Sequence, residues 1–335
     1  MYLDKSVAVV VPAYKEESQI ADVITTMPAF VDHIIVVDDA SPEPDRTCEI
    51  VESLRSEHPN VDLVARHENG GVGAAIESGY IRALELDADI ACVMAGDGQM
   101  DPADLHRIVH PVATGRADYA KANRLTLEYS WQSIPRTRLI GNMLLSFLTR
   151  FATGYWTVGD AQTGYTAGVS PLIAQFVKRG IYPRYGVPND LLISCALFGA
   201  RVVDIPTEPR YDVGEQSKLR PSRVALPIAI LLVKGFFRRL FVRYFVVEAN
   251  PVPLAYLAGF LSFLVGTTWS IVLVVQAIGG ATTTIEVVAA SLLFVGGSIL
   301  IVLAVVLDVL FSIAGSPRSA ESAAPEPPAD QDLGL

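Results

Sequence analysis

A polar turn that follows a buried apolar run carries two side chains able to bind a metal. The run Ile90–Met94 leads into Asp97 and Gln99, which place a carboxylate and an amide oxygen two positions apart. Hard oxygen ligands of this kind suit Mg²⁺ or Mn²⁺ bridging a diphosphate. Asp101 and Pro102 come next and predict the start of a helix, with the aspartate as N-cap and the proline at the first helical position. The sequence therefore predicts a divalent-metal site in front of a helix.

Two similar turns occur earlier in the chain, each after its own apolar run. The first holds Pro12, Tyr14 and Glu16, and the second holds Asp38 and Asp39. Tyr14 can flank a nucleobase, and either aspartate can accept hydrogen bonds from a base or a ribose. Taken singly, each turn is better explained by ordinary surface-turn chemistry, in which Asp and Gly are common. Their shared place at strand ends favours a ligand site, because open α/β sheets bind ligands there.

The elements that must position these turns alternate between strand and helix patterns. Strands are expected at Ser6–Val11, His33–Val37, Val61–Ala65 and Ile90–Met94. Apolar residues with helical spacing lie between them. The turn Asn69–Gly73 opens a helix expected over Ala74–Leu86, but it matches neither the dinucleotide-binding nor the P-loop spacing. The alternation predicts an α/β domain with a doubly wound, mostly parallel sheet and right-handed crossovers.

The following part of the domain is less regular. We expect a strand over Ala117–Ala122, a helix over Pro135–Ala152 and a short strand over Arg201–Ile205. Asp190 precedes a helix expected from Leu191. It serves either as that helix's N-cap or as a carboxylate that orients a substrate hydroxyl or acts as a base.

Composition limits the function classes. The chain has 335 residues and a formal net charge of −10, which argues against a nucleic-acid partner. Its three cysteines, Cys48, Cys92 and Cys195, are far apart and lack metal-site spacing. Neither a disulfide framework nor a zinc site is indicated.

The last third of the chain has the pattern of a membrane anchor. Basic side chains alternate with aromatic ones before Val247, as expected of an amphipathic helix lying in a membrane interface. Two uncharged runs, Pro251–Ile285 and Val287–Leu307, each exceed the roughly 20 residues that span a bilayer. The basic flank places the large domain in the cytoplasm by the positive-inside rule. Asp308 falls near the inner end of the second span, where we expect its charge to reach water.

Four of these segments stand in the order and at the spacing of family 2 glycosyltransferases. They are Val11–Glu16, Val36–Ser41, Asn69–Gly71 and Met94–Gln99. Together they resemble the polyprenyl-phosphate branch, which includes the dolichyl-phosphate mannose and glucose synthases. Gly214–Lys218 is similar to the G-x-S-K loop of that branch, with one extra residue. The resemblance covers residues 6–220 and implies a GT-A fold, the nucleotide-diphospho-sugar transferase type.

The resemblance also assigns expected roles to single residues. The residues expected to bind the nucleotide are Pro12, Tyr14, Glu16, Asp38 and Asp39, and those expected to bind phosphate are Arg124, Arg210 and Lys218. The expected metal ligands are Asp97 and Gln99. The expected catalytic residues are Asp97, Asp160 and Asp190, and Gln162 is expected beside the sugar. One departure is Ala95, where the family usually has an aspartate that completes a D-x-D pair. A water can replace that ligand, because Mg²⁺ normally keeps several.

The resemblance implies an enzyme that transfers one hexose, with inversion, from GDP-mannose or UDP-glucose to dolichyl or another polyprenyl phosphate. The acceptor phosphate has a second pKa of about 6, so it is already anionic and needs no strong base. Two alternatives stay open: transfer to a sugar or protein hydroxyl, which needs a catalytic carboxylate, and a membrane-anchored sugar-nucleotide binder without activity. A processive polysaccharide synthase would need more than two spans.

The expected organisation has four parts. A cytoplasmic catalytic domain covers residues 1–220, a basic amphipathic helix 221–250, a two-span hairpin 251–314 and a disordered tail 315–335. The protein is therefore expected in the cell membrane as a two-span protein. Its partners are a nucleotide sugar, a polyprenyl phosphate and a divalent metal, and the hairpin offers a surface for homo-oligomers.

Overall fold

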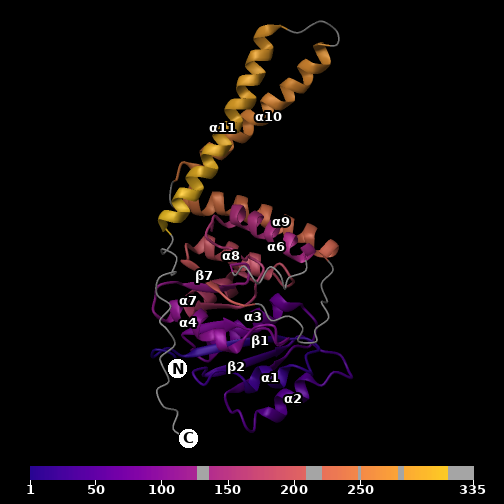
Figure 1. The fold of residues 1–335 in the computed structure, drawn as a ribbon, viewed down its shortest axis with the longest axis vertical. Helices are drawn as coiled ribbons and strands as arrows, with labels where there is room; N and C mark the ends of the chain where they lie inside the picture. Colours follow the sequence, from indigo (N-terminus) through magenta and orange to yellow (C-terminus); the bar gives the residue numbers. More distant parts are fainter. Residues whose placement is uncertain (127–135, 209–220, 248–249, 278–282, 316–335) are drawn as a thin grey trace. The chain divides into compact units, whose positions relative to one another are not determined.

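The computed structural model describes residues 1–126, 136–208, 221–247, 250–277 and 283–315. The described chain forms two compact units, Met1–Gly235 and Phe236–Gly315. The division falls inside the segment expected to be the amphipathic helix. Each unit is described separately below (Figure 1).

A seven-stranded sheet forms the centre of the first unit. Its strands are β1 Val7–Ala13, β2 His33–Asp38, β3 Val61–Ala65, β4 Ile90–Val93, β5 Tyr119–Asn123, β6 Thr166–Val169 and β7 Val202–Pro206. Their spatial order is β3-β2-β1-β4-β6-β5-β7, and only β6 runs antiparallel to its neighbours. The predicted doubly wound, mostly parallel sheet is confirmed.

Helices cover both faces of this sheet. They are α1 Ile20–Thr25, α2 Thr47–Leu54, α3 Val72–Glu85, α4 Leu105–Ala113 (preceded by the 3₁₀ turn η1, Pro102–Asp104), α6 Arg136–Thr153, α7 Ser170–Arg179 and α8 Val187–Phe198. On β1, Val7, Val9 and Val11 pack with α1, α2 and α4. Ala8 and Val10 pack with α3, α7 and α8 on the other face. Both faces of β1 are buried, which explains its continuous apolar sequence.

One predicted helix boundary is wrong. The helix expected from Leu191 begins at Val187, with Pro188 in its first turn. Proline fits there because the first turn's N–H groups have no intrahelical partners. Asp190 therefore lies inside the first turn of α8 and is not its N-cap.

Close packing between α3 and β1 makes one glycine essential. A Cβ added to Gly79 would lie 2.2 Å from Val10 Cγ1. We expect Gly79→Ala to lower the free energy of unfolding by about 1–3 kcal/mol, because the overpacked core must shift. Gly141→Ala on α6 is the matched control: its added Cβ meets nothing within 4 Å, so helix propensity should leave the protein as stable or slightly more stable. Thermal unfolding in detergent measures both variants, and equal melting temperatures would contradict this packing.

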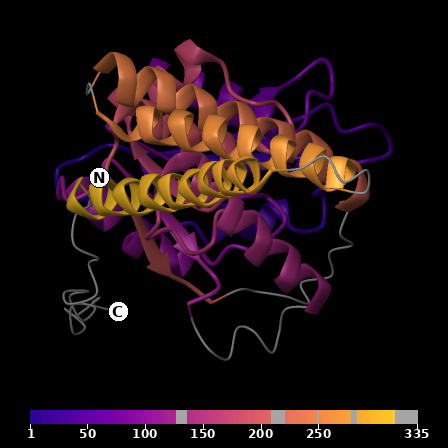
Figure 2. The same cartoon turned by 90° about the horizontal axis from the view of Figure 1, so that it is seen from above.

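The second unit contains a hairpin of two long apolar helices. Its elements are the end of α9 (Pro221–Arg239), the π-helix η2 (Leu240–Val247), α10 (Val252–Ala277) and α11 (Thr284–Gly315). Two helical stretches, Val252–Ala277 and Thr284–Phe311, are long and apolar enough to cross a membrane. They run side by side (Figure 2), and a Cβ on Gly266 of α10 would lie 2.4 Å from the backbone of α11. Such close helix contact at small residues is typical of membrane helices.

The expectation for Asp308 is wrong. Its side chain on α11 is fully buried and does not reach water. It is paired instead with Arg239, at the end of α9.

Candidate functional site

The order of the strands brings the three predicted turns together. β1 lies between β2 and β4, and all three strands are parallel. Their carboxyl ends therefore share one edge of the sheet. The Asp39 N–H donates to the Ala13 carbonyl (2.9 Å), and the Gly96 N–H donates to the Pro12 carbonyl (3.1 Å). These bonds join two turns to the end of β1: the Asp38–Asp39 turn and the turn that holds Asp97 and Gln99, called the metal turn below.

Asp38 is held by the turn that follows it. Its carboxylate accepts hydrogen bonds from the Ser41 hydroxyl (2.6 Å) and the Ser41 N–H (2.9 Å). The Lys15 N–H donates to the same hydroxyl (2.9 Å), so Ser41 links this turn to the one containing Tyr14 and Glu16. Burial, together with the nearby Asp38 carboxylate, raises the pKa of Cys48 to about 11. The Cys48 thiol therefore stays protonated beside Asp38 at neutral pH.

Asp39 has a different environment from its neighbour. Its carboxylate accepts hydrogen bonds from the N–H groups of Gly70 (2.9 Å) and Gly71 (2.7 Å), and from Arg66 Nε (2.9 Å). Gly71 adopts φ +93°, a conformation that favours glycine. The Asp39 carboxylate thus anchors the glycine turn that opens α3. The nucleotide-binding role that the resemblance implies for Asp39 stays a prediction.

The metal turn is compact. Asp97 Oδ1 accepts a hydrogen bond from the Gln99 N–H (3.1 Å), and the intervening Gly98 has φ +72°. Asp101 caps the following 3₁₀ turn through the Ala103 N–H (2.9 Å), as the sequence predicts. Within the described residues, no group of three His, Cys, Asp or Glu side chains gathers to hold a metal. Asp97 and Gln99 fit a cation whose remaining ligands come from a diphosphate and water.

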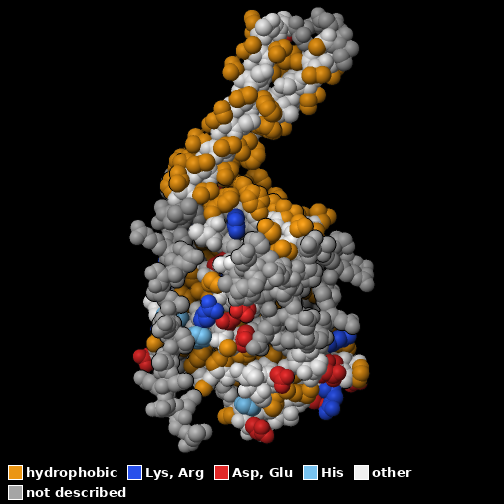
Figure 3. All heavy atoms as spheres, in the orientation of Figure 1, with side chains coloured by type: hydrophobic (Ala, Val, Ile, Leu, Met, Phe, Trp, Pro, Cys, Tyr) orange, Lys and Arg blue, Asp and Glu red, His pale blue; other side chains and the backbone are white. Residues whose placement is uncertain are grey.

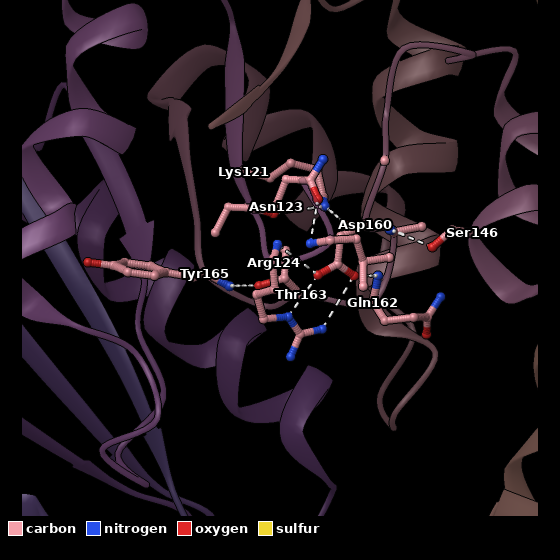
Figure 4. Close-up of polar contacts among 12 residues, drawn as sticks. Lys121, Asn123, Arg124, Ser146, Asp160, Gln162, Thr163 and Tyr165 are labelled. Atoms are coloured by element: carbon pink, nitrogen blue, oxygen red, sulfur yellow. Dashed lines mark hydrogen bonds and ion pairs between the residues drawn. The ribbon is translucent and has the colours of Figure 1, made fainter. Parts of the chain in front are cut away.

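The second half of the site is built by the antiparallel strand β6. Because β6 opposes both β4 and β5, its first residues meet the carboxyl ends of both strands. Arg124 follows β5 and binds the Asp160 carboxylate, with Nε 2.7 Å from Oδ2 and Nη2 3.3 Å from Oδ1 (Figure 4). Burial favours a higher pKa for Asp160, but Arg124, Lys121 and the Gln162 N–H outweigh it and lower the pKa to about 2. Asp160 is therefore a charged side chain that orients Arg124.

Two charged side chains near this pair were not predicted: the buried Lys121 and the half-buried Asp204. Lys121 on β5 is 1% exposed and donates to the main-chain carbonyl of Asp160. Asp204 on β7 accepts from the Asn123 amide (2.8 Å) and the Gly159 N–H. Burial lowers the pKa of Lys121 and raises that of Asp204. The signal in the sequence was a lysine between two alanines within an expected strand.

One pocket joins the two halves of the site. Its lining residues come from the metal turn, the end of β5, the start of β6 and the end of β7. They are Gln99, Met100, Asp101, Asp104, Ala122, Arg124, Thr163, Tyr165, Thr207 and Glu208. The Tyr165 hydroxyl donates to the Asp101 carbonyl (2.8 Å) and fixes the two halves together. A predicted metal ligand and a predicted phosphate-binding arginine thus line the same pocket.

The other predicted residues lie elsewhere. Asp190 is buried, pairs with Arg179 of α7 and accepts from the Tyr182 N–H (2.9 Å). It therefore braces the segment whose Pro183 carbonyl accepts from the Gly73 N–H (2.8 Å). Arg210 and Lys218 lie outside the described residues.

Comparisons with known proteins agree with this arrangement. Residues 8–173 match the model of glycosyl transferase family 2. A UDP-N-acetylglucosamine–dolichyl-phosphate N-acetylglucosaminyltransferase of Methanococcus voltae is 29% identical over 68% of this chain and 94% of its own. The polyprenol monophosphomannose synthase of Mycolicibacterium smegmatis is 28% identical over 68% of this chain and 87% of its own.

A solved structure shares the fold. Glucosyl-3-phosphoglycerate synthase from Mycobacterium tuberculosis, crystallised with Mn²⁺ and UDP-glucose, superimposes with a TM-score of 0.50 at 20% identity. The match covers 70% of this chain and 79% of that one. The chain therefore belongs to glycosyl transferase family 2, is a glycosyltransferase with a GT-A-like fold, and resembles the polyprenyl-phosphate branch of that family.

Proposed function

We propose that the chain transfers a single sugar residue, with inversion, from a nucleoside diphosphate sugar to a polyprenyl phosphate. The observation that carries this proposal is the pocket that holds both Gln99 and Arg124. It offers a metal ligand for the donor diphosphate and a guanidinium for a second anion. The two curated relatives differ in their sugar but share an acceptor of the polyprenyl-phosphate class. The donor candidates are GDP-mannose and UDP-glucose, which the sequence resemblance implies, and UDP-N-acetylglucosamine, for which one of these relatives is named. The transferred sugar is therefore a hexose or an N-acetylhexosamine.

The reaction follows from these charges. An oxygen of the acceptor phosphate forms the new bond to the sugar's anomeric carbon. The bond to the donor diphosphate breaks on the opposite face, and its electron pair leaves with the nucleoside diphosphate. Arg124 brings the two anions together by neutralising charge, and Asp160 holds its guanidinium in place. A bound divalent ion, held by Asp97 and Gln99, would stabilise the charge that develops on the departing diphosphate.

The placement of Asp190 favours a phosphate acceptor over a hydroxyl acceptor. A hydroxyl needs a general base within hydrogen-bond reach. Asp190, the carboxylate that the sequence offered for this purpose, is buried and bound to Arg179 and the Tyr182 N–H. An anionic phosphate needs no such base, so positioning accounts for the catalysis.

The helix α6 buries its polar face and exposes its apolar face, which supports an acceptor that lies in a membrane. On α6, the small polar residues Ser146 and Thr149 are buried, and Ser146 accepts from the Ala161 N–H (3.0 Å) next to Asp160. The opposite face of α6 exposes large apolar side chains: Ile140 (66%), Met143 (54%), Leu144 (58%) and Phe147 (48%). Hydrophobic side chains also gather over α9 (Figure 3). Such patches mark a membrane or protein contact.

We further propose that the first unit lies in the cytoplasm, because Lys234, Arg238 and Arg243 flank the first span and the positive-inside rule applies. Self-association of the hairpin and the boundaries of the four predicted parts stay predictions.

A donor screen tests the proposed function. The purified full chain is incubated with Mn²⁺, undecaprenyl phosphate and each labelled donor in turn, and the lipid extract is separated by thin-layer chromatography. We expect one donor to label a lipid carrying a single sugar residue. Nucleotide binding without any transfer, or labelling only of added saccharide, would overturn the proposal.

The position of Ala95 gives a separate prediction. Its side chain cannot ligate a metal, so we expect Ala95→Asp to lower the Mn²⁺ concentration for half-maximal activity, by about tenfold for one added charged ligand worth roughly 1.4 kcal/mol. Ala95→Asn is the matched control, since it adds similar volume without charge. A metal titration of activity compares the three proteins. An unchanged midpoint in Ala95→Asp would place the metal elsewhere.

A further inference from the structure

A fully buried ion pair joins the end of α9 to the end of α11 within the second unit. Arg239 Nη1 lies 2.8 Å from Asp308 Oδ1, and Nη2 lies 2.7 Å from Oδ2. The two side chains are 1% and 0% exposed. This is the paired, bidentate geometry that binds a carboxylate most strongly. Residues far apart in the sequence thus close the open end of the hairpin.

The π-helix η2 supplies a third member. Tyr244 donates its hydroxyl hydrogen to Asp308 Oδ1, and Arg239 Nη1 lies 3.1 Å from the same hydroxyl oxygen. Arg239 and Tyr244 are five positions apart, which would place them on different faces of an α-helix with 3.6 residues per turn. The i→i+5 winding of a π-helix brings such a pair to one side. The irregular helix is therefore what completes the cluster.

The surroundings of the cluster are apolar and aromatic. The guanidinium of Arg239 lies 5.9 Å from the ring centre of Phe236 and 5.2 Å from that of Tyr244. Tyr256 of α10 packs edge-on against Phe236, with ring centres 5.4 Å apart. Taking two charges out of water is costly, and apolar residues of similar volume often stabilise a fold as well. A buried pair of charged side chains at a candidate membrane span therefore points to a function.

We propose that Arg239, Asp308 and Tyr244 form a clamp of positioning residues that fixes how the chain passes from the catalytic unit into the hairpin. Arg239 lies in the last turn of α9, a helix that begins in the first unit, and Asp308 belongs to a candidate span. Within the second unit, Arg239 holds the Asp308 carboxylate with two directional bonds, and Tyr244 adds a third to the same carboxylate. An acceptor phosphate anchored in the bilayer has a fixed depth, and small misplacements of a reacting group cost large factors in rate. This inference rests on the proposed membrane-lipid acceptor.

The test separates positioning from folding by comparing two acceptors. One is undecaprenyl phosphate in phosphatidylcholine vesicles that contain the reconstituted full chain. The other is citronellyl phosphate, which is short and water-soluble, added to the full chain in detergent. The main variant is the double substitution Arg239→Met with Asp308→Leu, which removes both charges together and leaves no unpaired one.

We expect the double variant to fold and to keep its kcat/KM for citronellyl phosphate within about twofold. Its kcat/KM for undecaprenyl phosphate in vesicles should fall by about 10-fold to 100-fold. An equal fall for both acceptors would show a structural contribution only, and no fall for either would show that the clamp has no function; both overturn the proposal. If the wild-type chain transfers to neither acceptor, the proposed function itself fails.

Two tyrosines give a milder test that does not depend on the double variant folding. Tyr244→Phe removes the hydroxyl shared with Asp308, and we expect a threefold to tenfold fall in kcat/KM, about that of one lost hydrogen bond, for the vesicle-bound acceptor alone. Tyr256→Phe is the matched control, because its buried hydroxyl has no hydrogen-bond partner among the described residues. Tyr256→Phe should have the wild-type kcat/KM for both acceptors. Equal kcat/KM values of the two variants for the vesicle-bound acceptor would overturn the proposed clamp.

Discussion

Asp97→Asn is expected to lower kcat by about 10²–10³-fold or more, the range seen when one group that stabilises transition-state charge is removed. The substitution keeps the shape of the side chain and can preserve the turn, in which Asp97 Oδ1 accepts from the Gln99 N–H at 3.1 Å. It removes the negative charge that would help to hold a divalent ion beside the donor diphosphate. Nucleotide affinity should fall much less than kcat, because Asp38 and its neighbours stay intact.

Single-turnover assays with saturating donor measure this effect. Asp87→Asn is the matched control: it removes an exposed carboxylate from the loop before β4, at the opposite end of that strand, and asparagine tolerates its positive φ of 53°. Asp87→Asn should keep wild-type activity. If Asp97→Asn retains full activity and full metal dependence, Asp97 is not a metal ligand.

Arg124→Met is expected to reduce both activity and stability. Asp160 would be left buried without its main counter-charge, which typically costs about 3–5 kcal/mol for a buried pair. Transfer should also fall by several orders of magnitude, since no guanidinium would offset the repulsion between donor and acceptor anions. Arg124→Lys keeps the charge without the planar fork and should show intermediate losses.

The stability loss should depend on pH with a defined sign. The pKa of Asp160 is about 2 in the folded chain, below the value of about 3.9 for an unfolded aspartate. Its contribution to stability is therefore fully present above pH 4 and is lost as the pH falls through 2. The difference in unfolding free energy between the wild type and Arg124→Met should therefore decrease as the pH falls from 4 to 2. A difference that stays constant from pH 6 to pH 2 would contradict the assigned ion pair.

Much of the catalytic half of the fold could be predicted, because buried parallel strands have continuous apolar sequences. Runs such as Val7–Val11 and Ile34–Val37 are unambiguous, and polar residues directly after them must lie at one sheet edge. β6, by contrast, is only four residues long and contains Gly168, so its sequence carries little strand signal. Its antiparallel direction, which brings Asp160 to Arg124, depends on contacts distant in sequence.

The roles of neighbouring or isolated charged residues could not be predicted from the sequence for a similar reason. Asp38 and Asp39 have the same side chain, and only the glycine turn about thirty positions later shows that Asp39 is a structural anchor. Asp308 looked like a charge within reach of water because its partner, Arg239, precedes it by 69 positions. Whether a charged side chain is solvated or paired depends on tertiary contacts. The local sequence pattern carries no information about those contacts.

In the proposed reaction, the acceptor phosphate supplies its own nucleophile. The most direct measurement gives the wild-type chain its labelled donor with either undecaprenyl phosphate or undecaprenol, and determines the anomeric configuration of the product by NMR. We expect a sugar phosphodiester of inverted configuration from undecaprenyl phosphate and no product from undecaprenol. Transfer to the hydroxyl of undecaprenol, or a product that retains the donor's configuration, would contradict the proposed reaction.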